Sequence, residues 1–432
     1  MTTQTVLPVE ASALTAFSER SSEPAWLKEK RLQALELAGQ LELPKLEKTR
    51  IDRWNLQNYG APGAGAQPGQ ELPDSISAYV DPAHNDNLIV QRNSGAVVAR
   101  LSKELSAQGV IFTDLETAAK EHGELVQKYL SSVIPAGENQ LTALHHAIWN
   151  GGVFLYVPQG VEIEIPLQAV FLVDDADAVF APHVLVVAES NSRVTYVDNY
   201  ISGELNSPLV HNGAVEVIVK PGAKVQYATV HHLGSQITDL TYRRALVEND
   251  GSIEWIVGEM SGGDSMSETL SVLKGNGSLS DAKVIAVGSG SQRLNYTTKA
   301  THYGKSSESQ MITRAVMREE ATAIINGITK IEKGATKANG EQTEKVLMLS
   351  KKARGDANPI LLIDEDDVKA GHAASVGQVN QEQIYYLMSR GISREQAERL
   401  IIYGFLAPVV SDIPLKQLQD QLQALVERKL GQ

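Results

Sequence analysis

The residue of this chain best suited to chemistry is His372, an imidazole set among the small residues Gly371, Ala373 and Ala374. Small neighbours let a backbone or a partner approach closely, and imidazole is a ligand that suits iron. Just upstream lies the acidic run Asp364–Asp367. Its spacing lacks the alternating ligands and the glycine of a calcium loop, so we expect a solvated turn there.

The elements around His372 decide what its imidazole can meet. The apolar run Pro359–Ile363 predicts one buried strand that ends at the acidic run. If a strand continues through His372, one face carries the histidine and four apolar residues: Val368, Ala370, Ala374 and Val376. Two interpretations follow, a satisfied buried histidine or an interface histidine that points across an apolar face at another chain.

Other candidate motifs are weaker. In the pairs His145–His146 and His231–His232, neighbouring side chains diverge, so a pair cannot easily chelate one ion. We expect one buried and one exposed histidine in each pair. The segment Tyr303–Ser306 ends like a phosphate-binding loop, but Lys299 occupies the place of the first glycine. Nucleotide binding by this chain is therefore not expected.

Composition limits the classes of function. The 432 residues carry a net charge of −13, which disfavours nucleic acid and anionic membranes as partners. No apolar run is long enough for a transmembrane helix, and the first residues do not form a secretory signal, so we expect a cytoplasmic protein. The chain has no cysteine, which excludes disulfides, thiolate catalysis and thiolate ligands within it.

The chain divides into four regions. Residues 1–58 predict a helical region: an apolar-faced helix begins at Pro24, continues through Gln40 and is ended by Pro44, and Trp54 is expected to anchor the segment onto another part of the molecule. Residues 59–150 begin with a Gly/Pro-rich connector, Tyr59–Pro73, and continue as a small mixed α/β region with helices at Leu115–Leu130 and Asn139–Trp149. Residues 151–378 form the β core, and residues 379–432 form a C-terminal helical region.

The β core shows a regular period. Turn residues interrupt it about every 26–30 positions, inside the range of solenoid repeats; they fall near Asn191–Ser192, Pro221–Gly222, Asp250–Gly251, Asn276–Gly277, Ser306–Ser307 and Lys333–Gly334. The runs between them alternate apolar and polar residues. An antiparallel sandwich would alternate likewise, but the steady spacing and the scarcity of aromatics favour a right-handed parallel β-helix with helical ends.

The C-terminal helices carry recognisable start signals. Asn380 can cap a first helix, and Ser393 with Gln396 forms the capping-box pattern of a second. Two apolar stripes follow helical spacing: Ala397, Leu400, Ile401 and Gly404, then Leu418, Leu422 and Leu425 after Pro414. The simplest expectation is that both stripes pack on the end of the β core and close its exposed edge.

The stretch Ala353–Val410, together with Ala143–Trp149 and Met348–Pro359, closely resembles the SufB/SufD family of iron–sulfur cluster assembly scaffolds. The resemblance implies a non-catalytic scaffold with a β-helix core, a SufB-like paralogue as partner and a SufC-like ABC ATPase as second partner. Because the SufB branch carries an essential cysteine and this chain has none, it is most like the SufD branch.

The resemblance also assigns roles to residues. It implies that His372 lies at the junction with SufB, facing a SufB cysteine, where it binds a nascent cluster or iron. It implies that C-terminal helices dock SufC, and Tyr403, Gly404 and Phe405 are our prediction for that contact. No tightly bound cofactor is expected in the isolated chain. A flavin is associated with complexes of this family, although the sequence has no flavin motif.

Two alternatives remain open on the sequence. One is a homodimeric scaffold that uses the same β face on both chains. The other is a β-helix enzyme acting on polysaccharide, which would normally require secretion and clustered carboxylates along one face.

Overall fold

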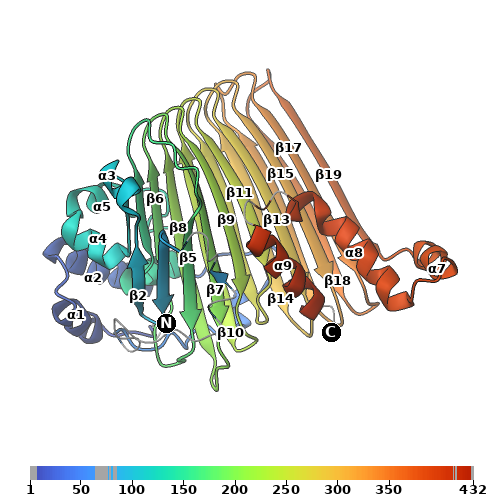
Figure 1. Cartoon of the computed structure of the whole chain (residues 1–432), viewed down its shortest axis with the longest axis horizontal. Coiled ribbons are helices and arrows are strands. Elements are labelled where there is room, and N and C mark those ends of the chain that lie inside the picture. The colour runs from blue at the N-terminus through green and yellow to red at the C-terminus, as the bar shows by residue number, and fades with distance from the viewer. Residues whose placement is uncertain are drawn as a thin grey trace.

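Strands in the central part of the chain alternate between two sheets, so that each coil of backbone adds one strand to each sheet. The computed structural model describes residues 7–63, 76, 79–80, 85–411, 413 and 416–429. Pairing along both sheets of the core is parallel, with partners from 26 positions apart (Asp239 and Ser265) to 32 positions apart (Thr322 and Arg354). This is a parallel β-solenoid of about eight turns, as the period predicted (Figure 1).

The two sheets differ in size by one strand. The ten-stranded sheet runs, in spatial order, β19 (Lys369–Gln378), β17 (Asn339–Met348), β15 (Glu308–Met317), β13 (Leu279–Gly288), β11 (Ser252–Glu259), β9 (Lys224–His232), β7 (Arg193–Ser202), β5 (Leu167–Val173), β1 (Leu88–Arg92) and β2 (Gly95–Arg100). The nine-stranded sheet runs β18 (Arg354–Ile363), β16 (Thr322–Ile331), β14 (Arg293–His302), β12 (Ser265–Leu273), β10 (Ile237–Val247), β8 (Leu209–Val219), β6 (His183–Ala188), β4 (Val153–Val157) and β3 (Ile111–Thr113).

The predicted interruptions are the turns that lead from the nine-stranded to the ten-stranded sheet. Asn191, Asp250 and Ser306 have φ of 58°, 54° and 54°, and Gly222 and Gly277 occupy the same left-handed region at equivalent turns. Asparagine, aspartate and glycine tolerate this conformation best. The turns also stack on one another through backbone hydrogen bonds, such as Asn191 N–H to the Pro221 carbonyl at 2.9 Å.

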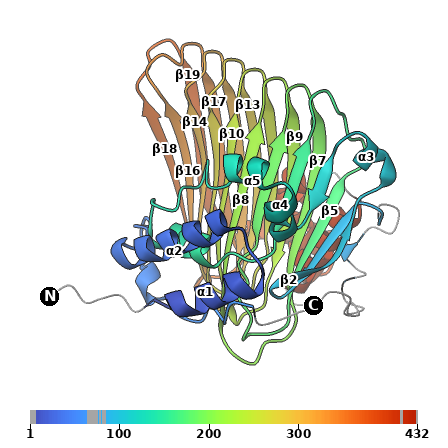
Figure 2. The same ribbon diagram turned by 90° about the vertical axis from the view of Figure 1, so that its left-hand side faces the viewer.

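The first coils are covered by antiparallel strands and helices. β1 pairs antiparallel with β2, and β3 pairs antiparallel with β4, which ends the parallel stacking at this side. The helices of this part are α1 (Ala11–Arg20), α2 (Ala25–Gln40), α3 (Lys103–Ala107), α4 (Leu115–Glu121), α5 (Gly123–Tyr129) and α6 (Gln140–Ile148). They lie at the end of the solenoid opposite to β18 and β19 (Figures 1 and 2). The predicted connector Tyr59–Pro73 lies largely outside the described residues.

A buried carboxylate fastens these helices to the nine-stranded sheet. Glu216 of β8 accepts backbone hydrogen bonds from Ser131 at 2.7 Å, Val133 at 2.6 Å and Ile134 at 2.8 Å. His183 Nε2 lies 3.1 Å from the same carboxylate. Burial opposes ionisation, but His183 and these N–H groups hold the pKa of Glu216 below its usual value. The N-terminal region is therefore anchored by a satisfied polar contact as well as by apolar packing.

The C-terminal helices are α7 (Gln381–Ser389), α8 (Arg394–Val410) and α9 (Lys416–Lys429). α8 and α9 pack on the outer face of the ten-stranded sheet, where Ile402, Leu406, Leu422 and Leu425 join one apolar cluster with that sheet (Figure 1). The expectation that these helices close the exposed edge of the solenoid is therefore wrong for the described residues. Pro414 and the side chain of Leu418 lie outside the described part. No described helix is long and apolar enough to cross a bilayer.

Candidate functional site

His372 lies on β19, the last strand of the ten-stranded sheet. On the neighbouring β17, the even-numbered positions from Gly340 to Val346, among them Gln342 and Glu344, point into the solenoid and are buried. Gln342 pairs with His372, so the imidazole stands on the same, interior-facing side. No further strand of the described chain covers it, and the residue is exposed. The buried interpretation is therefore wrong for this chain, and the interface role stays a prediction.

The open edge of β19 presents backbone groups that no described strand pairs. Lys369 N–H bonds to the Ala338 carbonyl at 2.9 Å and Val379 N–H to the Met348 carbonyl at 3.3 Å, so the odd-numbered residues face β17. In a parallel ladder the alternate residues direct both N–H and C=O the other way. His372 and its even-numbered neighbours therefore offer these groups to the open side. An unpaired edge of this kind is a template for another strand.

The same end exposes apolar side chains. Leu362 and Ile363 of β18 are 47% and 42% exposed, and Val376 of β19 is 42% exposed. The predicted acidic turn joins these two strands, and three of its four carboxylates are exposed. Glu365 accepts a hydrogen bond from the Gly334 N–H at 2.9 Å, which is the behaviour of a solvated turn and not of a metal site.

One interior carboxyl beside His372 escaped the sequence analysis. Glu344 is 1% exposed, and its Oε2 has no hydrogen-bond partner in the described chain. Burial raises the pKa of Glu344 to about 7. It pairs in register with Ala374, two residues beyond His372, so the side chains of Glu344 and His372 occupy the same face of adjacent strands.

The residues predicted for a helical docking contact lie on α8. Gly404 is exposed, but Tyr403 and Phe405 are only partly exposed and face the rest of the molecule. The Tyr403 hydroxyl donates to the Glu427 carboxylate of α9, and the guanidinium carbon of Arg314 lies 5.5 Å from the centre of the Phe405 ring. Tyr403 and Phe405 therefore help to hold α8 against the rest of the molecule, and the docking contact stays a prediction.

Large apolar side chains are exposed instead on α7 and the middle of α8. Tyr385 is 74% exposed, Tyr386 57%, Met388 43% and Leu400 51%. α7 projects beyond the last coil of the solenoid, away from the strands (Figure 1). They lie on two helices that contact each other, and exposed aromatic and apolar side chains are common at protein interaction surfaces.

The two histidine pairs differ from each other. His231 points into the solenoid and is buried, while His232 faces outward and is half-buried, close to the prediction. His145 and His146 are both buried, so the expected division is wrong for that pair. Helix α6 lies between α2 and the nine-stranded sheet, and both of its sides are therefore covered.

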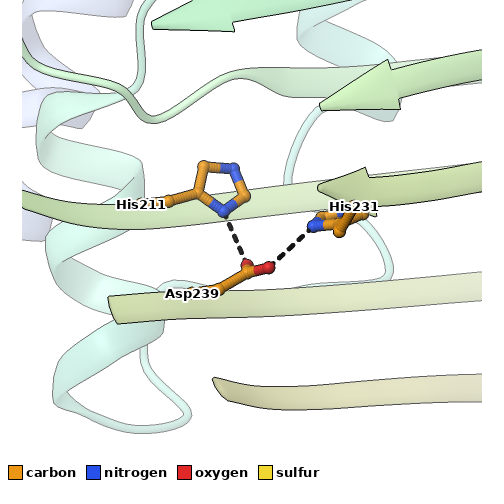
Figure 3. Close-up of side chains that lie close together, drawn as sticks. All are labelled: His211, His231 and Asp239. Carbon is orange, nitrogen blue, oxygen red and sulfur yellow. Dashed lines mark hydrogen bonds and ion pairs between the residues drawn. The ribbon is translucent and has the colours of Figure 1, made fainter. Parts of the chain in front are cut away.

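A polar network fills the middle of the solenoid. His211 Nδ1 lies 2.8 Å from Asp239 Oδ1, and His231 Nδ1 lies 3.0 Å from Asp239 Oδ2 (Figure 3). The carboxylate can only accept, so each ring carries its proton on Nδ1. Burial alone would raise the pKa of Asp239, but His231 and His211 lower it well below its usual value.

This network has the composition of a metal site but not the electrostatics of one. The Arg243 guanidinium donates to His231 Nε2 at 2.8 Å and to Glu259 at 2.9 Å, and it is fully buried. A cation bound by the two histidines and Asp239 would displace their Nδ1 protons beside this fixed positive charge. The network is better explained as a set of hydrogen bonds and ion pairs between buried groups, in which His211 Nε2, Arg243 Nε and Glu259 Oε2 have no hydrogen-bond partner among the described residues.

The fold and the open end define a class, a parallel β-solenoid whose last coil is not covered by any further strand of the described residues. Residues 171–405 match the family described as "SUF system FeS cluster assembly, SufBD core domain". Residues 18–169 match the family described as "SufBD protein N-terminal region". Together these matches span most of the 432 residues. The chain belongs to the SufBD family of the SUF iron–sulfur cluster assembly system.

Several curated relatives are similar over nearly their whole length. The chain is 49% identical to "Iron-sulfur cluster assembly protein SufD" of Bacillus subtilis, over all of both chains. It is 29% identical to an "Iron-sulfur cluster assembly SufBD family protein" of Staphylococcus epidermidis, over 93% of this chain and 89% of the relative. A Staphylococcus aureus member of the family is also 29% identical, over 93% of this chain and 88% of the relative.

Proposed function

We propose that this chain is a SufD-type scaffold subunit of a SufBCD-type complex, which assembles iron–sulfur clusters together with a SufB-like paralogue and a SufC-like ATPase. The observation that carries the proposal is the uncovered last coil, with His372 on its interior-facing side at an unpaired strand edge. Full-length similarity to a SufD protein supports it. The same similarity favours a scaffold over the polysaccharide-acting enzyme.

Pairing with the paralogue would occur through the open end. A strand of the partner added to β19 would satisfy the edge N–H and C=O groups and cover Val376 on its interior-facing side. Pro359 removes one edge donor from β18, because its backbone nitrogen would point to the same open side. The edge of β19 contains no proline and is the better template.

The chemistry at the junction would be shared between chains. His372 supplies an imidazole, which suits iron as a ligand. The sequence has no cysteine, so sulfur and thiolate ligands would come from the paralogue. Iron and the growing cluster are the cargo of this site and not a resident cofactor of the chain.

The ATPase would dock on the C-terminal helices. Its most favourable contact is the exposed apolar surface of Tyr385, Tyr386, Met388 and Leu400, with Gly404 at its border. Tyr403 and Phe405 would act by holding α8 in the orientation that presents this surface. Because α8 and α9 lie flat on the sheet that ends in β19, a force on these helices would reach the junction through packed side chains.

The proposal is tested by reconstitution with purified SufB-type and SufC-type proteins, a sulfur donor and Fe²⁺. His372→Ala is expected to keep the fold and the three-component complex, measured by circular dichroism and co-purification, and to reduce cluster yield to background. His122→Ala is the control, because this partly exposed histidine lies on the remote helical region. Normal cluster yield from His372→Ala would remove the histidine from the mechanism, and a wild-type chain that binds neither protein would refute the scaffold role.

A further inference from the structure

The carboxyl of Glu344 is buried without the partners that usually accompany a buried acid. The residue is 1% exposed, no ion pair of Glu344 is present within the described residues, and Oε2 accepts no hydrogen bond there. The ionised form of a buried carboxyl is strongly unfavourable without a partner, so such a group is either protonated or able to bind a cation. Burial raises the pKa of this acid to about 7.

The surroundings leave room for this carboxyl inside the solenoid. Glu344 extends from β17 toward β16, where a side-chain carbon on Gly327 would come within 1.8 Å of its Oε1. Only glycine fits at position 327 with the acid in this place. The neighbouring Gln342 is fixed by Thr329, whose hydroxyl donates to Gln342 Oε1 at 3.0 Å. The acid therefore stands in a defined position one coil below the open end.

Glu344 and His372 are diagonal neighbours on one face. His372 pairs with Gln342, and Glu344 pairs with Ala374. With strands about 4.8 Å apart and a rise of about 3.3 Å per residue, their Cα atoms lie roughly 8 Å apart. Both side chains point to the interior side of the last coils, and an ion between them could be reached from each. Only small side chains lie beside them on β19, because Ala370 and Ala374 flank His372 on this face.

We propose that Glu344 and His372 together bind a divalent cation, Fe²⁺ in the cell, at the mouth of the solenoid. Carboxylate and imidazole are the donor pair of many non-haem Fe²⁺ sites. The cation would satisfy the unpaired oxygen and supply a positive charge to Glu344, which forms no ion pair with any described residue. The inference rests on the proposed function for the identity of the metal, and it assigns the carboxylate ligand of the junction to this chain.

The test is anaerobic titration of the purified full-length chain with Fe²⁺, measured by calorimetry. The wild type is expected to bind one ion, and Glu344→Gln, which keeps the shape and removes the charge, is expected to weaken binding by about tenfold or more. Glu344→Asp should retain part of the affinity if the variant keeps the wild-type melting temperature. The matched control is Glu341→Gln, three residues away on the exposed outer face of the same strand, which should bind as the wild type does.

The outcomes separate this inference from the proposed function. No Fe²⁺ binding by the wild-type chain, or equal affinities for wild type and Glu344→Gln, would overturn the inference while leaving complex formation with the partners untouched. Fe²⁺ binding that depends on Glu344 in a chain that does not associate with SufB-type and SufC-type proteins would overturn the proposed function alone. Equal weakening by Glu341→Gln and Glu344→Gln would show a general effect of charge and would also overturn the site.

Discussion

A proline at position 374 is expected to block pairing at the open end without disturbing the solenoid. Ala374 lies on β19, and its N–H belongs to the set directed away from β17. Proline lacks this donor and is tolerated in an edge strand when the missing N–H faces outward. Ala374→Pro therefore leaves the ladder to β17 intact and removes a donor only from the surface offered to the partner.

The magnitude follows from the number of edge groups. Five residues of β19 present both backbone groups to the open side: Ala370, His372, Ala374, Val376 and Gln378. Each hydrogen bond to a partner strand is worth about 1 kcal/mol net. A proline ring at position 374, the centre of this edge, removes one hydrogen bond to the partner strand. It also keeps the partner's backbone from forming the hydrogen bonds on either side. The loss is about 3 kcal/mol, or roughly 100-fold in the Kd for the SufB-type partner.

The assay is a calorimetric or ultracentrifuge titration of the full chain with its SufB-type partner, accompanied by thermal unfolding and hydrogen exchange. Ala373→Pro is the matched control, because it places the same ring one residue earlier, where the N–H bonds to β17. The control should increase hydrogen exchange in the last coil, whereas Ala374→Pro should not. A Kd unchanged by Ala374→Pro would refute strand pairing at β19, and the partner contact would then lie elsewhere.

Two further predictions concern the stability of the helices that pack on the solenoid: α6 in the N-terminal region and α9 on the ten-stranded sheet. Burial and the nearby His183 lower the pKa of His146 to about 4, so the unfolded chain, with a histidine pKa near 6.5, takes up the proton first as pH falls. The free energy of unfolding should drop by about 2 kcal/mol between pH 7.5 and pH 5 on this account, and urea unfolding of His146→Gln should lack that part of the drop; an identical pH dependence would contradict it. Leu425 lies on the sheet-facing side of α9 and is 1% exposed, so Leu425→Ala should cost about 2–5 kcal/mol of local stability. Hydrogen exchange should then quicken in 416–429 alone, and equal quickening in the solenoid strands would contradict independent docking.

The solenoid could be predicted because each of its coils repeats one local requirement. A residue in the left-handed region is needed at the same point of every coil, and Asn191, Asp250 and Gly277 meet it there. Alternation within the strands then separates inside from outside. Turn conformation and strand alternation depend on nearby residues, so they can be recognised without knowing how distant parts of the chain pack.

The exposure of His372 could not be predicted in the same way. Its apolar strand face is the same whether a further coil covers it or not, and coverage depends on where the C-terminal helices go. The helices carry apolar stripes that fit either the end of the solenoid or its outer face. In the structure α8 and α9 occupy the outer face, through residues such as Leu406 and Leu422, and β19 stays open.

Glu344 was missed for a different physical reason. The segment Gly340–Lys345 contains no large apolar residue at either its odd-numbered or its even-numbered positions. The sequence pattern therefore does not show whether Gln342 and Glu344 or their neighbours point inward. Only the register with β15 and β19 decides it. A buried acid in a strand that looks solvent-exposed carries no hydrophobic signal, although it is the kind of group that function retains at a cost in stability.

Binding of a second chain to the open edge of β19 would also change the environment of the buried Glu344. The first coils are closed by the antiparallel strands β2 and β3, but the last coil has no such cover within the described residues. A partner strand on β19 would place Glu344 deeper below the surface and increase the desolvation that already raises its pKa. At that depth the carboxylate is stable only beside a cation. Assembly of the two chains would therefore favour either protonation of Glu344 or metal binding to it. Metal binding is the favoured outcome because the imidazole of His372, on the same face, would supply a second ligand.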